Sequence, residues 1–245
     1  MPLYTADALI LRTYKLGEAD RIVVFLTRDR GKKRGVAKGA RRPRSRFAAA
    51  LEPLTEVRVA YFEQEQRELV GLNYAETVRS PLAFAMGPLR GGPADRVRQG
   101  RVASRPDQPE RSHEHLDALG YLGYFAELLD EWAQEADADD RLYRLGASML
   151  DALDAGAPVE PLARYFEYWL LRLQGVYPEA RGTLSDDAMA FLAAARSVTP
   201  QNVGDLPVPR NVLRELENVH RALIAMHLEK TLKSDRVLRD LRRNN

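Results

Sequence analysis

The stretch DALILRTYKLGEADRIVVFLT, residues 7–27, has the pattern of two β-strands joined by a turn. Its two ends, residues 7–12 and 21–27, are short runs rich in aliphatic, β-branched and aromatic side chains, which favour extended backbone. The segment between them contains Gly17 and Asp20, residue types that suit a tight turn. We therefore predict a β-hairpin in this part of the chain.

Three more strands are predicted within the first 80 residues. The run RGVAKGA, residues 34–40, is small and flanked by glycine, and LTEVRVAYF, residues 54–62, alternates between apolar and polar positions. A fifth candidate, RELVGLNYAE, covers residues 67–76. Five short strands with glycine-marked turns are typical of a small closed or partly open barrel, so we assign residues 1–80 to a β-barrel domain.

The composition changes after this domain. Residues 86–115 contain four Pro and four Gly and few apolar side chains, so we predict that 81–115 form a linker or insertion. From Leu116 the apolar residues recur at helical spacing, and residues 116–245 are predicted to form a helical domain. Strands first and helices afterwards indicate an α+β multidomain protein, a β-barrel followed by an all-α domain.

The most unusual feature is the concentration of positive charge in GKKRGVAKGARRPRSRF, residues 31–47. From Arg30 to Arg46 there are nine Lys or Arg and no Asp or Glu, whereas the net charge of the whole chain is only +2. A solvated charge run is the simplest explanation. The run is however predicted to lie within a strand-rich domain, contains Gly35 and Gly39, and adjoins aromatic residues.

Barrels that bind single-stranded nucleic acids typically have cationic and aromatic side chains next to each other on the binding surface. The aromatic residues here are Phe25, Phe47, Tyr61, Phe62 and Tyr74, and each could belong to the core or stack on bases. We predict that eight basic residues supply the main phosphate contacts: Lys32, Lys33, Arg34, Lys38, Arg41, Arg42, Arg44 and Arg46. A second basic contact, or a docking site for an acidic partner segment, is predicted at Lys230, Lys233, Arg236 and Arg239 near the C-terminus.

Catalytic and metal-binding patterns are scarce. The chain has no cysteine, which excludes disulfides and thiolate metal sites, and its histidine spacings do not match a helical zinc pair. His220 and His227 are predicted to be packed or half-exposed, and the acidic pairs at 139–140 and 186–187 to mark helix starts. No phosphate-binding loop of the GxxxxGK[ST] type occurs. We therefore predict a protein that is not an enzyme and uses no metal or cofactor.

No run of apolar residues is long enough for a transmembrane helix, and the first residues do not resemble a signal peptide. These features predict a soluble, cytoplasmic protein that does not bind membranes.

Several motifs resemble the bacterial recombination mediators of the RecO family. They are GEADRIV at 17–23, KGARRPRSRF at 38–47 and LEPLTEV at 51–57, together with RYFEYWLLRLQGVYPE at 164–179 and HLEKTLKSDRVLRDL at 227–241. The resemblance covers most of the chain apart from roughly residues 82–114. It implies an N-terminal OB-fold and a helical C-terminal domain.

The resemblance also implies a function and partners. It implies binding of single- and double-stranded DNA, annealing of complementary strands, and loading of RecA together with RecR and single-stranded-DNA-binding protein, in the bacterial cytoplasm at the nucleoid. Many members of the family carry a four-cysteine zinc module after the helix that matches LRLQGVYPE in this sequence. Here the segment that follows, YPEARGTLSDDAM at residues 177–189, contains no cysteine. We therefore transfer no metal site to this chain.

Two other functions remain open from the residues alone. An RNA-binding protein with an OB-type barrel would use the same combination of cations and aromatic residues. A non-catalytic interaction scaffold would work mainly through its helical domain. A preference for RNA would favour the first, and partner binding that survives charge reversal of the basic loop would favour the second.

Overall fold

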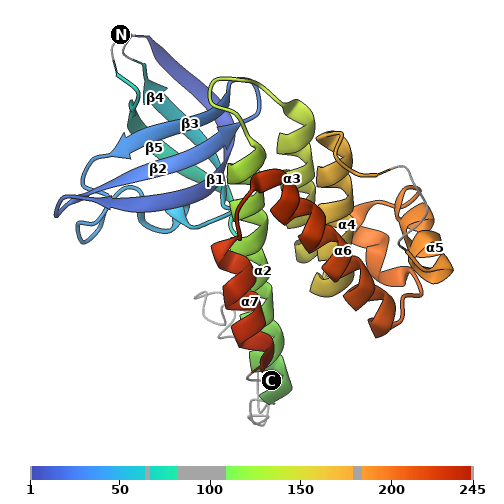
Figure 1. Cartoon of the computed structure of the whole chain (residues 1–245). Helices are drawn as coiled ribbons and strands as arrows, with labels where there is room; N and C mark the ends of the chain where they lie inside the picture. Colours follow the sequence, from blue (N-terminus) through green and yellow to red (C-terminus); the bar gives the residue numbers. More distant parts are fainter. Residues whose placement is uncertain (1, 64–66, 82–108, 179–183, 244–245) are drawn as a thin grey trace.

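The computed structural model describes residues 2–63, 67–81, 109–178 and 184–243, and it contains a β-barrel followed by a group of helices (Figure 1). The barrel strands are β1 (Leu3–Leu16), β2 (Asp20–Thr27), β3 (Gly31–Ala37), β4 (Glu56–Phe62) and β5 (Val70–Arg79), with a short 3-10 helix, η1 (Ala48–Leu51), before β4. The helical part contains α2 (Pro109–Trp132), α3 (Asp140–Asp154), α4 (Val159–Leu173), α5 (Asp186–Ala195), η3 (Pro200–Asp205), α6 (Arg210–Leu228) and α7 (Lys233–Arg243).

The five strands close into a barrel in the order β1-β2-β3-β5-β4, with β4 returning to β1. All neighbours are antiparallel except β3 and β5, which are parallel. Alternate side chains fill the interior, among them Ile10, Phe25, Val57 and Tyr61, because successive residues of a strand point to opposite sides. The predicted fold class, an OB-like barrel followed by helices, is confirmed.

The third strand lies earlier in the sequence than predicted. It covers Gly31–Ala37 rather than residues 34–40, because it pairs with β2 from Arg21↔Ala37 to Thr27↔Gly31. Gly31 has a positive φ of 67°, and a Cβ added there would lie 2.2 Å from the backbone oxygen of Asp137. Only glycine fits this start, and the shift places Lys32 and Lys33 on the strand together with Arg34.

Polar side chains cap the starts of α3 and α5. The Asp139 carboxylate accepts hydrogen bonds from the backbone N–H groups of Arg141 and Leu142 at the start of α3, and Ser185 caps α5 in the same way. These positions confirm the predicted helix starts at the two acidic pairs. Helix α2 begins at Pro109, before the predicted start at Leu116, and the predicted linker otherwise lies mostly outside the described residues.

The helical part packs directly on the outer face of the barrel. Leu9, Leu11, Val24 and Leu26 point away from the barrel interior and belong to the same apolar core as α2, α3 and α4. The approach is close at Gly146 of α3, where an added Cβ would lie 2.7 Å from Leu9 and 2.8 Å from Leu129. Outward-facing side chains of β1 and β2 therefore share one hydrophobic core with the helices.

Of the two histidines on α6, His220 is packed, as predicted, whereas His227 is exposed. His220 is fully buried, with Nδ1 2.9 Å from Oε2 of Glu167 and Nε2 3.3 Å from the hydroxyl of Tyr177. His227 stacks on Trp132 with ring centroids 5.6 Å apart. The buried Glu167 also accepts hydrogen bonds from Arg164 and from the hydroxyl of Tyr124. The buried polar groups of His220 and Glu167 therefore have hydrogen-bond partners inside the helical core.

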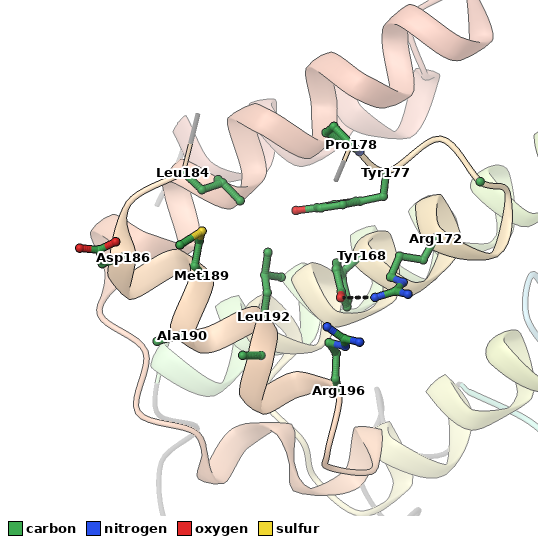
Figure 2. A pocket seen from close by; sticks show the side chains of 12 residues that line it. Tyr168, Arg172, Tyr177, Pro178, Leu184, Asp186, Met189, Ala190, Leu192 and Arg196 are labelled. Carbon is green, nitrogen blue, oxygen red and sulfur yellow. Dashed lines mark hydrogen bonds between the residues drawn. The ribbon is translucent and has the colours of Figure 1, made fainter. Parts of the chain in front are cut away.

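An open hollow of about 1000 Å³ lies between α4 and α5 (Figure 2). Its wall includes Tyr168, Arg172, Tyr177, Met189 and Arg196, and Arg172 donates a hydrogen bond of 3.0 Å to the hydroxyl of Tyr168. The described part of the chain contains no group of three or more His, Asp or Glu residues placed to hold a metal ion, in this hollow or elsewhere. In the same described part, no helix is long and apolar enough to cross a membrane.

Candidate nucleic-acid interface

The basic segment after β3, residues 38–46, is fastened to the turn between β1 and β2. The backbone N–H of Arg41 donates to the carbonyl oxygen of Ala19 (2.9 Å), and its Nη1 donates to the carbonyl oxygen of Gly17 (2.7 Å). The backbone N–H of Gly39 donates to the Asp20 carboxylate at 2.7 Å. The predicted turn residues Gly17 and Asp20 thus hold this basic loop in place on the barrel.

Four cations on the basic loop are exposed and form no ion pair with any residue that the structure describes: Lys38, Arg42, Arg44 and Arg46. Within the loop, Arg42 donates its backbone N–H to the carbonyl oxygen of Gly39 at 3.0 Å, and Ser45 donates to Arg42 at 3.1 Å. Arg44 has a positive φ of 58°, and the guanidinium of Arg46 lies 5.1 Å from the centre of the Phe47 ring. The basic loop therefore presents uncompensated positive charge on a folded scaffold.

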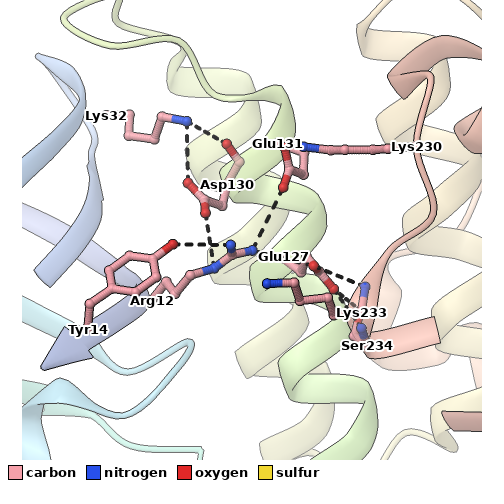
Figure 3. Close-up of polar contacts among 9 residues, drawn as sticks. All are labelled: Arg12, Tyr14, Lys32, Glu127, Asp130, Glu131, Lys230, Lys233 and Ser234. Carbon is pink, nitrogen blue, oxygen red and sulfur yellow. Dashed lines mark hydrogen bonds and ion pairs between the residues drawn. The ribbon is translucent and has the colours of Figure 1, made fainter. Parts of the chain in front are cut away.

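The three cations on β3 are placed differently. The Nζ of Lys32 donates to the backbone oxygen of Asp130 at 2.5 Å and lies 3.3 Å from its carboxylate, in a side chain only 15% exposed (Figure 3). Lys33 pairs with Glu63 at 2.7 Å. Arg34 pairs with Glu135 at 2.8 Å. Carboxylates from outside the basic stretch therefore neutralise these three of the eight predicted phosphate contacts.

Asp130, the partner of Lys32, belongs to a larger group of charged residues at the C-terminal part of α2. Arg12 of β1 lies within 3.3–3.8 Å of Glu127, Asp130 and Glu131 (Figure 3). Lys230, one of the predicted second set, pairs with Glu131. We call Arg12, Lys32, Glu127, Asp130, Glu131 and Lys230 the interdomain cluster, because it joins the barrel to α2 and to the segment before α7.

Glu127 connects three elements within the interdomain cluster. It accepts hydrogen bonds from the backbone N–H of Ser234 (2.7 Å), from the Ser234 hydroxyl (2.5 Å) and from the backbone N–H of Lys233 (3.2 Å) at the start of α7. Burial tends to raise the pKa of this carboxyl, but the bonds from Ser234 and Lys233 and the charge of Arg12 outweigh it and hold the pKa below its ordinary value.

The rest of the predicted second basic set is exposed where the structure describes it. The side chains of Lys233 and Arg236 point to solvent on α7 and form no ion pair with the described residues. The side chain of Arg239 lies outside the described residues. Of this set, Lys230 is therefore neutralised within the protein, while Lys233 and Arg236 keep their charge available.

Comparison with known proteins agrees with this arrangement of domains. The family model for "Recombination protein O N terminal" matches residues 1–81, and that for "Recombination protein O C terminal" matches residues 113–182. The chain belongs to the RecO family. The barrel with its basic loop lies in the first matched region, and α2, α3 and α4 lie in the second.

Relatives of this RecO-family chain carry the name DNA repair protein RecO. The protein from Koribacter versatilis is 36% identical over 177 residues, which is 72% of this chain and 61% of the relative. The protein from Anaeromyxobacter sp. (strain K) is 36% identical over 170 residues, 69% of this chain and 56% of the relative. The protein from Bifidobacterium adolescentis is 54% identical over 78 residues, 32% of this chain. The first two alignments thus span less than two thirds of their relatives' length.

Most aromatic residues singled out from the sequence belong to the core of this RecO-family barrel. Phe25, Phe47 and Tyr61 are fully buried, and Phe62 is half-buried. Tyr74, on β5, is 37% exposed. The sequence analysis missed Tyr14, which is 46% exposed next to the turn that holds the basic loop. Tyr14 lies three positions before the predicted turn residue Gly17, but its outward position depends on a bulge in β1.

Proposed function

We propose that this RecO-family chain is a DNA-binding recombination mediator in DNA repair, that it anneals complementary strands, and that it catalyses no reaction. The observation that carries the proposal is the basic loop, where Lys38, Arg42, Arg44 and Arg46 are exposed and unpaired among the described residues. This loop is fastened to the β1–β2 turn, at the end of the barrel where OB-folds bind oligonucleotides. The names of the relatives, DNA repair protein RecO, support the same role.

The charge distribution supports annealing without an energy source. Two complementary strands repel each other as polyanions, and a dense group of cations reduces that repulsion and raises the rate of encounter. The sequence has no phosphate-binding loop that could couple nucleotide hydrolysis to strand exchange. We therefore expect annealing to be independent of ATP and to weaken with rising salt.

Its partners are proposed from the family. We propose that the chain acts with RecR and single-stranded-DNA-binding protein, that it helps to load RecA onto single-stranded DNA, and that it works at the nucleoid in the bacterial cytoplasm. Of the predicted DNA contacts, the four cations of the basic loop have the strongest support, and Arg41 serves to fasten the loop through Gly17 and Ala19. Lys32, Lys33 and Arg34 have less support, since each pairs with a carboxylate.

The test is a salt titration of binding to single-stranded DNA, duplex DNA and single-stranded RNA of one sequence, together with annealing of labelled strands with and without ATP. We expect both DNA forms to bind with affinity that falls linearly on a log–log plot against salt, and annealing to accelerate equally without ATP. Acceleration that requires ATP would contradict the mechanism. Preferential binding of RNA would instead support an RNA-binding protein.

A scaffold function has its own outcome in these experiments. If the chain binds no nucleic acid at any salt concentration but retains its protein partners, the helical domain is the working part. Cutting the chain near Thr231 is not a clean test of the C-terminal cations, because Leu232 and Leu238 are buried in the helical core and Ser234 bonds to Glu127. Single substitutions on α7 avoid this problem.

A further inference from the structure

The outer face of the barrel is only partly covered by the helices. A bulge in β1 between Ile10 and Arg12 changes the alternation, so that Arg12 and Tyr14 point outward after Ile10 points inward. Arg12 contacts α2 through the interdomain cluster, whereas Tyr14 lies beyond it toward the β1–β2 turn. Outward-facing Leu9, Leu11, Val24 and Leu26 are covered by the helical core, and the face continues past them.

The uncovered part of this face is a row of apolar side chains across three strands. Tyr14 of β1 pairs with Ile22 of β2, and Ile22 pairs with Val36 of β3. Tyr14 is 46% exposed, and Ile22 and Val36 are half-buried. The row continues to Gly71 of β5, where an added Cβ would meet nothing within 4 Å. We call Tyr14, Ile22 and Val36 the platform row.

Cations flank the platform row on two sides. On one side, Lys38 follows Val36 by two residues, and the basic loop is fastened to the turn that joins Tyr14's strand to Ile22's strand. On the other side, Nη1 of Arg12 donates to the Tyr14 hydroxyl at 3.2 Å, and Arg12 shares the Glu127 carboxylate with the backbone of Lys233. Figure 3 shows this second side, where Arg12 lies between Tyr14 and Glu127, and Glu127 contacts the start of α7.

We propose that Tyr14 stacks on a base of single-stranded DNA on the platform row, beside the basic loop, and that this contact favours single strands over duplex. The proposal rests on the proposed function, and it adds a residue that selects the form of DNA. Unpaired bases stack on exposed aromatic rings, and cations beside the ring hold the phosphates of the same strand. The bases of a duplex are already stacked on each other, so Tyr14 should contribute little to the binding of a duplex.

The test compares Tyr14→Ala, Tyr14→Phe and the matched control Tyr74→Ala, another half-exposed tyrosine on the barrel, on β5. Each variant is titrated with single-stranded oligonucleotide, with an abasic strand of equal length and with duplex. We expect Tyr14→Ala to weaken single-strand binding by about 5- to 100-fold and to leave abasic-strand and duplex binding within about twofold. Tyr14→Phe keeps the ring, so its affinity should stay close to that of the unchanged chain, as should that of Tyr74→Ala.

The abasic strand separates stacking from a structural effect. If Tyr14→Ala weakens binding to normal and abasic strands equally, or if Tyr14→Phe loses as much affinity as Tyr14→Ala, the stacking role is wrong. Unchanged single-strand affinity in Tyr14→Ala would also overturn it. These failures differ from failure of the proposed function, in which the unchanged chain itself binds no DNA. Melting temperatures close to that of the unchanged chain verify that each variant is folded.

Discussion

The two halves of the basic stretch differ in the use of their charge. On β3, Lys32, Lys33 and Arg34 lie within 2.7–3.3 Å of carboxylates from other parts of the chain. On the basic loop, Lys38, Arg42, Arg44 and Arg46 have no such partner among the described residues and are exposed. Lysines and arginines only a few positions apart therefore have different roles. Those on β3 form ion pairs within the protein, and those on the basic loop are available to bind a polyanion.

The physical difference lies in what the cations exchange on binding. A phosphate that approaches the basic loop replaces water and counterions, and the release of counterions from DNA drives binding. A phosphate that approaches Lys32 would have to displace the Asp130 carboxylate from a site where both side chains are mostly buried. Breaking such a pair leaves a buried charge without a partner, and the free energy lost is larger than the free energy gained from one surface contact with a phosphate. Local charge density alone is therefore a poor guide to a DNA contact.

The largest effect that this comparison predicts comes from neutralising the basic loop. We expect the triple variant Lys38→Gln, Arg42→Gln and Arg44→Asn to bind single-stranded DNA about 100-fold more weakly at about 0.1 M salt, and the salt slope to fall by about 2. Asparagine suits the positive φ of 58° at position 44, and glutamine keeps the stem of Arg42 that lies beside Gly39. The measurement is a titration at several salt concentrations.

The control for this triple variant is a thermal melt, which should be unchanged because none of the three side chains has a partner among the described residues. Equal losses for sequences of different composition are expected, since phosphate contacts carry no base information. An unchanged affinity together with an unchanged salt slope would remove the basic loop from the DNA-binding surface.

The second prediction concerns the interdomain cluster, which neutralises Lys32 of the β3 half. We expect Glu127→Gln to lower the free energy of unfolding by about 2 kcal/mol, because charge-assisted hydrogen bonds from Ser234 and Lys233 are weakened and Arg12 loses a partner. Chemical denaturation measures the change. Glu131→Gln is the matched control on the same helix. Among the described residues its carboxylate pairs with the long cationic side chains of Arg12 and Lys230, so a smaller loss is expected.

The pH dependence of Glu127→Gln has a definite sign. The pKa of Glu127 is held below its ordinary value in the folded protein, so its ionised form adds stability at neutral pH, and this contribution is lost as pH falls through the lowered pKa. The difference in stability between the unchanged chain and the variant should therefore narrow at acid pH, below about 4.5. A difference that stays constant from neutral to acid pH would contradict the assignment.

The sequence predicted the fold because its signals were local. The apolar alternation around Val57 and Val59 and the turn at Gly17 determine strands without knowledge of distant residues. The partners of Lys32 and Arg34 could not be predicted, because Asp130 and Glu135 are about a hundred positions away and meet β3 only after the helices pack on Leu9 and Val24. The outward position of Tyr14 depends on the bulge in β1, which leaves no clear pattern in the sequence.

A smaller effect is expected when the β3 half loses one charge. Lys32→Met keeps most of the side-chain stem but removes the ammonium group that bonds to Asp130. We expect a loss of about 1 kcal/mol in the free energy of unfolding, since Asp130 retains Arg12 as a partner at 3.3 Å. Binding of DNA should stay within about twofold of the unchanged chain, with an unchanged salt slope. A slope that falls by about 0.7 would instead identify Lys32 as a phosphate contact, and the two halves of the basic stretch would then act alike.

The smallest expected effect tests whether the DNA-binding surface extends from the basic loop to the exposed Lys233 on α7. Lys233 is exposed at the start of α7, and its backbone shares Glu127 with Arg12, next to Tyr14. If a strand that leaves the basic loop passes Tyr14, its next phosphates meet Lys233, and one lost contact weakens binding about fivefold at about 0.1 M salt. We therefore expect Lys233→Gln to weaken single-strand binding by this factor and to lower the salt slope by about 0.7, while Lys230→Gln, whose ammonium already pairs with Glu131, changes the affinity less. Equal effects of the two substitutions would mean that α7 contributes only general positive charge. No effect of either would confine the DNA contact to the barrel.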